Sequence, residues 1–438
     1  MKTLRLLPLT LAIGAALALP AQAQSLLDLY QSAKAFDANY QSAKSLYEAN
    51  LAKGEQAKAG LLPTIGLGLG ANRSDSTSDL ATFERNFGNQ SATLSASQPL
   101  YRPANVATAE QGKKQAELAR VQLLAADQDL IVRVSQAYFD VLAAQDNLDF
   151  VKAQKTAVSE QLASAKRNFE VGTATITDTR EAQARSDLVL AQEIASENDL
   201  RIKKLALDQL TGRVAAPKPL LVPVVLPAIV PEEVAPWVAQ SEELSPAVQQ
   251  AKLALEVAQL ETQKAQAGHK PTLDLTGSYN VNKTNGTINS SQEYRTNVAT
   301  VGLAFNLPLF AGFAVQNRVK ETVALEEKSR SDLDAATRGV AQGTRSAFFG
   351  VQSGLGQVKA LEAAEASSQS ALDATKLGYQ VGVRINIDVL NAQTTLFDTK
   401  AKLAKARYDV LVGSLKLRQA NGSLKEEDIN AINALLAQ

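Results

Sequence analysis

The sequence contains no cysteine among its 438 residues. The fold therefore has no disulfide framework, and neither thiol chemistry nor a lipid anchor on an N-terminal cysteine is possible. His269 is the only histidine; it falls at a predicted helix-to-strand junction, and we interpret it as a polar surface residue. A chain of this length with one histidine and no cysteine is poorly equipped for zinc, iron or Ser-His chemistry. We therefore predict no catalytic residues, no metal site and no cofactor, and we interpret the protein as a non-enzyme.

Aromatic residues are scarce, at 5% of the chain, and neither sign of charge predominates, with 45 basic and 45 acidic residues. The charge balance gives no electrostatic reason to expect nucleic acid or a polybasic membrane contact. The chain is instead rich in Ala, Gln, Leu, Lys and Glu. This composition favours thin, closely packed helices over a thick globular core.

Long apolar runs are also missing, because after the N-terminal segment no stretch approaches the roughly 18 apolar residues of a membrane helix. Residues 1–23 have the pattern of a signal peptide. Lys2 and Arg5 precede an apolar run from Leu6 to Leu19, and Ala21-Gln22-Ala23 forms a cleavage site. The alternative, a transmembrane anchor, requires a longer run. The exported chain is then periplasmic, secreted, or a membrane protein of the β type.

An internal repeat with an offset of about 210 residues organises the rest of the chain. Phe169-Glu-Val-Gly-Thr173 matches Tyr379-Gln-Val-Gly-Val383, and Gln209-Leu-Thr-Gly212 matches Gln419-Ala-Asn-Gly422. Ordered matches over a whole half predict duplication of one structural unit, with a first repeat at 24–213 and a second at 238–438. The intervening segment 214–237 contains six prolines and is predicted to be an extended linker.

Each half has the same predicted order of elements. A first helix (about 25–58; about 246–266) is followed by two strands, a very long helix (about 104–168; about 313–377), a tight turn, and a shorter helix (about 175–211; about 385–421). At about 1.5 Å per residue the long helix would measure roughly 97 Å. Apolar residues spaced alternately by four and three from Leu130 to Phe169 predict that such helices form a coiled coil or a helical tube.

Four segments alternate apolar with small or polar residues, at about 62–72, 90–100, 271–282 and 297–308. Each has about the length of a tilted membrane crossing. The connections at about 73–88 and 284–295 are polar and are predicted to be external loops. A soluble sheet covered on one face is the alternative. Four strands cannot close a membrane barrel, whereas three chains would supply twelve strands.

The duplication, the strand pairs and the turn segments Phe169–Asp178 and Tyr379–Asp388 together resemble the TolC family of outer-membrane channel-tunnels. The resemblance covers essentially the whole exported chain. It implies a mainly α fold with a membrane β-barrel contribution, built from long coiled helices and four β-strands per chain. It also implies a homotrimer with a 12-stranded barrel in the outer membrane of a Gram-negative bacterium and an α-helical barrel in the periplasm.

The same resemblance implies the function and the partners. The trimer would be the passive exit duct of a tripartite efflux pump or a type I secretion system. It would contact outer-membrane lipid, a periplasmic adaptor protein, and an inner-membrane ABC or proton-driven exporter. Drugs, toxins and secreted proteins all remain compatible as cargo. A non-pore coiled-coil scaffold, periplasmic or secreted, is the alternative function, and outer-membrane fractionation would separate the two.

The resemblance places an entrance gate at the second turn. Tyr379 and Arg384 correspond to residues that bond across to the neighbouring hairpin, here to Thr177 and Asp178. Asp388 corresponds to one of two acidic rings at the narrow entrance. The position of the second ring holds Asn391, so a trimer would carry one ring of three carboxylates. The simpler interpretation of Arg384 and Asp388, spaced i, i+4, is a surface ion pair of little energy.

The Val-Gly turns have a structural explanation, because glycine ends a helix in a left-handed conformation without a Cβ penalty. The resemblance adds a second role, docking of the adaptor at both helix tips. The predicted docking residues are Val171, Gly172, Thr173, Val381, Gly382 and Val383.

Overall fold

The computed structural model describes residues 24–78, 81–221, 223–287 and 290–437, so the predicted signal peptide lies outside the described residues. The chain divides into two compact units. Unit 1 contains Met1–Ala43, Leu123–Pro246 and Thr337–Gln438, and unit 2 contains Lys44–Gln122 and Ala247–Ala336. Within the described ranges, every helix is too short or too polar to cross a membrane.

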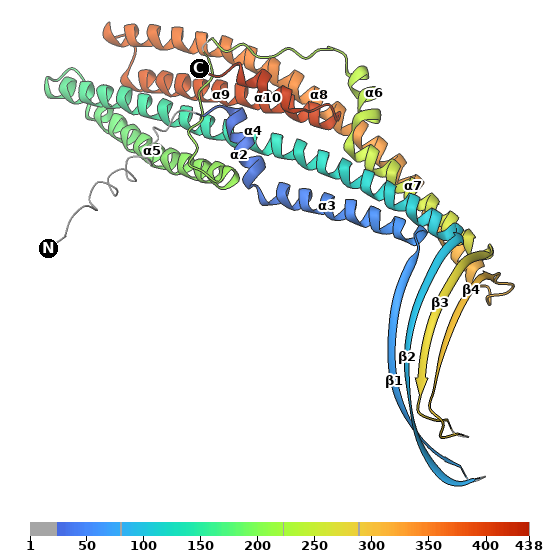
Figure 1. The fold of residues 1–438 in the computed structure, drawn as a ribbon. Helices are drawn as coiled ribbons and strands as arrows, with labels where there is room; N and C mark the ends of the chain where they lie inside the picture. Colours follow the sequence, from blue (N-terminus) through green and yellow to red (C-terminus); the bar gives the residue numbers. More distant parts are fainter. Residues whose placement is uncertain (1–23, 79–80, 222, 288–289, 438) are drawn as a thin grey trace, which may run out of the picture. The chain divides into compact units, whose positions relative to one another are not determined.

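Unit 2 contains a four-stranded antiparallel sheet in the order β1-β2-β3-β4 (Figure 1). The strands are β1 (Thr64–Ser78), β2 (Ala81–Tyr101), β3 (Thr272–Thr284) and β4 (Tyr294–Asn306). One row of the sheet pairs Leu67 with Leu94, Leu94 with Tyr279, and Tyr279 with Ala299. The β2–β3 pairing joins strands from the two halves of the sequence. The predicted mainly α fold with four strands per chain is thus confirmed.

The strands continue further than the apolar alternation predicts. The first external loop was expected at about 73–88, yet β1 runs to Ser78 and β2 begins at Ala81. Likewise β4 begins at Tyr294, inside the second expected loop. Antiparallel ladders are made by backbone groups, so a polar hairpin rich in Ser, Thr and Asn can extend the pairing without an apolar face. Residues 79–80 and 288–289 lie outside the described residues.

Helix ends of unit 2 lead into the strands through two short 3-10 turns, η1 (Ala59–Leu61) and η2 (Ala267–His269). The helix α3 (Ala38–Lys58) packs against the start of α4 (Pro103–Glu170) through glycine. A Cβ on Gly112 would lie 2.6 Å from the Cβ of Ala57, so a larger residue would push the two backbones apart. His269 ends η2, at the helix-to-strand junction where the sequence places it.

Unit 1 is helical and has the main core of the chain. It contains α2 (Leu26–Phe36), α5 (Ile176–Thr211), α9 (Asn386–Ala420), α10 (Glu426–Asn433) and the adjoining parts of α4 and α8 (Ala314–Gln380). Tyr30, Tyr138 and Phe139 are fully or almost fully buried, and the ring of Phe139 stacks on Tyr408 with centroids 5.6 Å apart. Aromatic rings of this size contribute much apolar burial, although they are few.

The first helix, expected at about 25–58, is divided at Asp37. This residue has an extended backbone after α2, and its carboxylate accepts a hydrogen bond from the backbone N–H of Tyr40 at 2.8 Å in the first turn of α3. Aspartate in this position satisfies a free donor at a helix start. The break is therefore set by a capping side chain that the periodicity does not record.

The predicted linker at 214–237 is extended only in its first part. Backbone bridges join Pro217 to Gln24 and Leu220 to Leu436. The helix α6 (Val234–Leu244) then starts inside the expected linker, and α7 (Pro246–Gln266) follows. Pro236 lies in the first turn of α6, where the N–H that proline lacks has no intrahelical partner to lose.

Candidate functional site

The two helix turns of unit 1, which hold most of the predicted site residues, are built alike. After α4, Gly172 has φ +79°, and after α8, Gly382 has φ +82°. In each turn a backbone N–H reaches back five residues, from Thr173 to Asn168 O at 2.8 Å and from Val383 to Gly378 O at 2.9 Å. Left-handed glycine with this backward bond satisfies carbonyls at the end of a helix.

The helices that leave the two turns begin differently. At α5, the Thr175 hydroxyl accepts from the N–H of Asp178 at 3.2 Å, and the Asp178 carboxylate accepts from the N–H of Thr175 at 2.9 Å. At α9 the equivalent cap position holds Ile385, whose N–H donates to the Asp388 carboxylate at 3.3 Å. Each acidic residue thus satisfies a donor at a helix start, where negative charge is also favoured. Asp178 and Asp388 therefore have local structural roles.

The predicted gate residues of the second turn make contacts within the chain. The Tyr379 hydroxyl accepts a hydrogen bond from Asn168 Nδ2 at 3.2 Å, and the exposed Arg384 lies 3.8 Å from the carboxylate of Asp388. Among the described residues of one chain, no contact joins Tyr379 or Arg384 to Thr177 or Asp178. Those bonds to the neighbouring hairpin stay a prediction.

Asn391, at the position of the second acidic ring, accepts a hydrogen bond from Arg185 Nη2 of α5 at 2.9 Å. An amide oxygen satisfies the guanidinium without adding charge. The turn region of α9 therefore has a single carboxylate of the predicted pair of rings, Asp388.

Asn386 is a site residue that the sequence interpretation missed. It is the first residue of α9, yet it is 1% exposed. Its side-chain oxygen accepts from Gln161 Nε2 of α4, and its Nδ2 donates to the backbone carbonyl of Asp178 at 3.3 Å. The repeat holds a signal for it, because the matching residue in the first half is the exposed, apolar Ile176.

The predicted docking residues at the two tips are open to solvent in the single chain. Val171, Val381 and Val383 are each largely exposed, and a Cβ added at Gly172 or Gly382 would meet no atom within 4 Å. Each of the two turns therefore exposes apolar side chains that the described part of the chain leaves largely uncovered.

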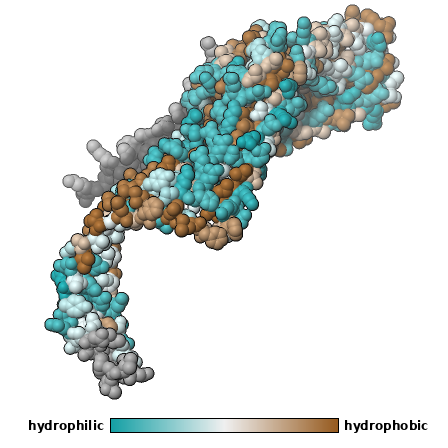
Figure 2. All heavy atoms as spheres, turned by 90° about the vertical axis from the view of Figure 1, so that its right-hand side faces the viewer, coloured by the Kyte–Doolittle hydropathy of each residue, from teal (hydrophilic) through white to brown (hydrophobic). Residues whose placement is uncertain are grey.

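The sheet of unit 2 exposes large apolar side chains to solvent among its small and polar residues. Val301 is 82% exposed and Ile65 is 74% exposed, although both belong to regular strands. Figure 2 shows that hydrophobic surface also gathers where the strands meet the helices. Large exposed side chains at that junction include Leu62, Leu100, Tyr101, Leu307, Leu309, Phe310 and Phe313. Exposed apolar surface of this extent marks a site of contact with a partner or a membrane.

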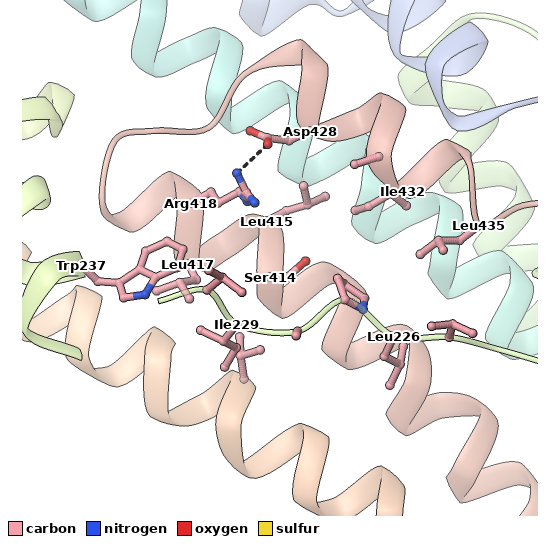
Figure 3. Close-up of a pocket in the computed structure, with 16 residues that line it drawn as sticks. Leu226, Ile229, Trp237, Ser414, Leu415, Leu417, Arg418, Asp428, Ile432 and Leu435 are labelled. Atoms are coloured by element: carbon pink, nitrogen blue, oxygen red, sulfur yellow. Dashed lines mark hydrogen bonds and ion pairs between the residues drawn. The ribbon is translucent and has the colours of Figure 1, made fainter. Parts of the chain in front are cut away.

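Two other features of the chain carry polar groups. A cavity of about 250 Å³ in unit 1 lies between residues 225–230, α9 and α10, with an Arg418–Asp428 pair at 2.8 Å beside apolar walls (Figure 3).

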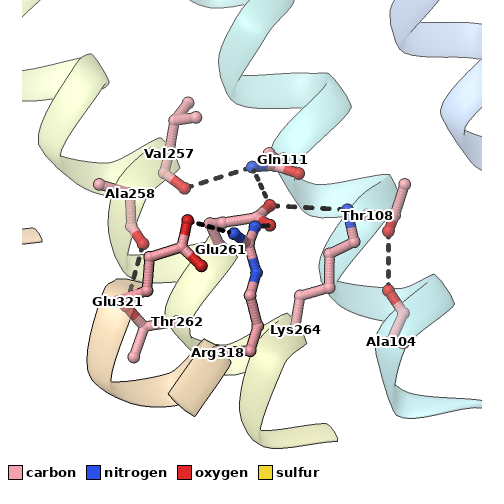
Figure 4. A network of polar contacts seen from close by, with 10 residues as sticks. All are labelled: Ala104, Thr108, Gln111, Val257, Ala258, Glu261, Thr262, Lys264, Arg318 and Glu321. Carbon is pink, nitrogen blue, oxygen red and sulfur yellow. Dashed lines mark hydrogen bonds and ion pairs between the residues drawn. The ribbon is translucent and has the colours of Figure 1, made fainter. Parts of the chain in front are cut away.

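In unit 2, Glu261 of α7 accepts hydrogen bonds from Arg318 of α8 at 2.6 Å and from Gln111 of α4 at 3.1 Å (Figure 4). Burial pushes the pKa of Glu261 up, but these hydrogen bonds outweigh it and hold the pKa below its usual range. The network joins three helices.

None of these features has the composition of an active site. Within the described residues, no group of three or more His, Cys, Asp or Glu side chains is placed to hold a metal ion. The polar groups at the two turns are amides, caps and one ion pair, which fix helices and do not activate a nucleophile.

Known proteins similar to this chain are efflux and secretion proteins. The family model described as outer membrane efflux protein matches residues 29–213 and 237–423. The chain is 34% identical to the outer membrane protein TolC of Vibrio cholerae, over 94% of each chain. It is 32% identical to the proteases secretion protein PrtF of Dickeya chrysanthemi, over 94% of this chain and 91% of that protein.

The fold agrees with solved structures as well. The Campylobacter jejuni CmeC outer membrane channel has a TM-score of 0.79 and 16% identity, over 94% of this chain and 89% of that chain. The outer membrane protein VceC of Vibrio cholerae has a TM-score of 0.78 and 18% identity, over 91% and 96%. The chain therefore belongs to the outer membrane efflux protein family, whose members are efflux and secretion channels of the Gram-negative outer membrane and are not enzymes.

Proposed function

We propose that three copies of this chain form the passive exit duct of a tripartite efflux pump or a type I secretion system. The observation that carries the proposal is the open sheet. Among the described residues, the outer strands β1 and β4 each pair on one side only. Unpaired strand edges are costly in lipid, so a membrane sheet has to close on itself. Three four-stranded sheets supply the twelve strands of a barrel with an open lumen.

The helical part supports a role that depends on partners. The exposed valines of the two tips offer an apolar surface to a periplasmic adaptor, which would connect the duct to an inner-membrane ABC or proton-driven exporter. The duct itself would be passive, with the exporter supplying the energy. The names of two relatives, PrtF and the alkaline protease secretion protein AprF of Pseudomonas aeruginosa, favour secretion, and the name of the family favours efflux.

We infer that the two halves arose by duplication of one structural unit, with repeats at 24–213 and 238–438 and a linker at 214–237. The two separate segments matched by the family model support this division. So does the order of elements, in which two strands, a long helix and a shorter helix occur twice.

Planar bilayers provide the test. Purified protein should insert and give discrete ion currents, and cells lacking the gene should lose export of either a protein cargo or small toxic compounds. Val381→Asp with Val383→Asp is the informative variant, because it should conduct in bilayers yet fail to restore export. A wild-type protein that fractionates with the outer membrane and never conducts would favour the scaffold alternative.

A further inference from the structure

Unit 1 contains two helical hairpins. Hairpin 1 is the pair α4–α5 and hairpin 2 is the pair α8–α9. The helix α9 belongs to hairpin 2 but also packs against hairpin 1. On one face, Val389 and Leu396 of α9 pack with Leu372 of α8. On another face, the fully buried Leu390 packs against hairpin 1. Its neighbours there are Val158, Ala165, Ala182 and Val189.

Asn386 adds the most buried polar contact between the hairpins. Its amide joins both helices of hairpin 1, with the oxygen on Gln161 of α4 and the Nδ2 group on the Asp178 carbonyl at 3.3 Å. Other links between the hairpins near the turns are more exposed, among them Asn168 to Tyr379 at 3.2 Å and Arg185 to Asn391 at 2.9 Å. Further along the hairpins, Tyr408 of α9 donates to Asp146 of α4 at 2.6 Å. The Asn386 amide is thus satisfied on both sides, although it is 1% exposed.

A buried amide of this kind favours two discrete states. If hairpin 2 moves slightly away from hairpin 1, the buried Asn386 amide loses its hydrogen bond to Gln161 before water can reach it. An unsatisfied buried group costs more free energy than a hydrogen bond contributes. Only a larger movement, which hydrates the Asn386 amide, recovers that loss. The contact therefore opposes partial opening and permits either full contact or full separation.

We propose that Asn386, with Gln161 and the Asp178 carbonyl, is an intrachain latch that holds hairpin 2 on hairpin 1 and keeps the periplasmic entrance in its resting state. The inference rests on the proposed duct function and adds a positioning residue to it. The latch is separate from the predicted bonds of Tyr379 and Arg384, because Asn386 is buried and its partners are Gln161 and a backbone carbonyl.

The first test is the conductance of Asn386→Ala, of Gln161→Ala and of the double variant in planar bilayers. Loss of the latch should shift the ratio of open to resting channels by roughly fivefold or more. The double variant should add little to either single variant, because both remove one contact. The matched control is Asn147→Ala, which removes a part-buried hydrogen bond to Ser196 at 3.1 Å that lies inside hairpin 1. It should leave conductance unchanged.

The second test uses the absence of cysteine. Cysteines introduced as Gln161→Cys and Asn386→Cys, bridged by a short reducible thiol cross-linker, should hold the channel at resting conductance until reductant is added. Correctly assembled Asn386→Ala channels with wild-type or lower conductance would overturn the latch. A wild-type protein that gives no current would instead refute the duct, so the two failures are distinguishable.

Discussion

At the scale of single residues, the ion pair between Asp37 and Arg133 holds the helix break of unit 1 against α4. Both guanidinium nitrogens Nη1 and Nη2 donate to the Asp37 carboxylate at 3.0 Å, and the aspartate is 8% exposed. These hydrogen bonds from Arg133 hold the pKa of Asp37 below its usual range despite its burial. Bidentate, charge-assisted contacts of this type are stronger than neutral ones.

We predict that Asp37→Asn lowers the free energy of unfolding by about 1.5–3 kcal/mol at neutral pH. A lowered pKa means that the ionised form stabilises the fold above the ordinary Asp value of about 3.9, and that this contribution is lost as the pH falls through the folded-state pKa. The melting temperatures of wild type and variant should therefore differ at pH 7, and they should differ much less at a pH below the folded-state pKa of Asp37. Asp129→Asn is the control, since this carboxylate also binds Arg133, at 2.6 Å, but is exposed and should cost under about 1 kcal/mol.

Asp388 combines a cap with the single predicted carboxylate ring, and two substitutions separate these roles. Asp388→Asn and Asp388→Ala should both reduce the preference of the channel for cations over anions, measured as a reversal potential in a salt gradient. Asn can still accept from the N–H of Ile385, whereas Ala cannot, so only the Ala variant should lose about 1 kcal/mol of stability. An unchanged reversal potential in both variants would place the selectivity elsewhere.

At the scale of elements, the two helix turns share a backbone design but differ in their side chains. If Tyr379 and Arg384 bond to Thr177 and Asp178 of the neighbouring hairpin, they close the entrance by contacts of about 1 kcal/mol each, or somewhat more when charged. Tyr379→Phe combined with Arg384→Ser should then raise conductance in planar bilayers without dissociating the assembly. Wild-type conductance from intact assemblies would show that the gate lies at other residues.

The tip valines belong to the same scale, because they occupy turns and not helix interiors. Val171→Asp should weaken capture of the periplasmic adaptor in a pull-down from membranes by about tenfold or more, since a charge replaces an apolar contact surface. Because the side chain is exposed and outside regular structure, stability should change by less than about 0.5 kcal/mol. The exposed Leu188 of α5, changed to Asp, is a control for loss of any apolar residue on the helical surface.

At the scale of the whole molecule, the open edges of the four-stranded sheet are the reason to expect a trimer. Among the described residues, the outer strands β1 and β4 each leave one row of backbone groups unpaired, and lipid cannot satisfy such groups. Mass measurement of the purified protein in a mild detergent should therefore give three times the mass of the exported chain. A monomer that stays stable and folded in detergent would contradict the trimer and, with it, the proposed duct.

The sequence by itself determined which segments are mainly helix or strand, because the heptad spacing of a helix and the two-residue alternation of a strand are patterns of residues close together in the chain. The same holds for Gly172 and Gly382, whose left-handed conformations are local requirements of a helix end. Local patterns also explain the errors. The break at Asp37, the start of α6 at Val234 and the polar ends of β1 and β2 depend on capping and ladder pairing, not on apolar spacing.

The tertiary structure alone decided which distant residues meet. Asn386 lies 225 positions from Gln161, and no period in either segment indicates that one amide will be buried against the other. The pairing of β2 with β3, and the sharing of α9 between two hairpins, are likewise set by packing across the two halves. Apolar periodicity marks the face of a helix that is buried, but the partner of that face is chosen by the shape and hydrogen-bonding groups of an element far away in the chain.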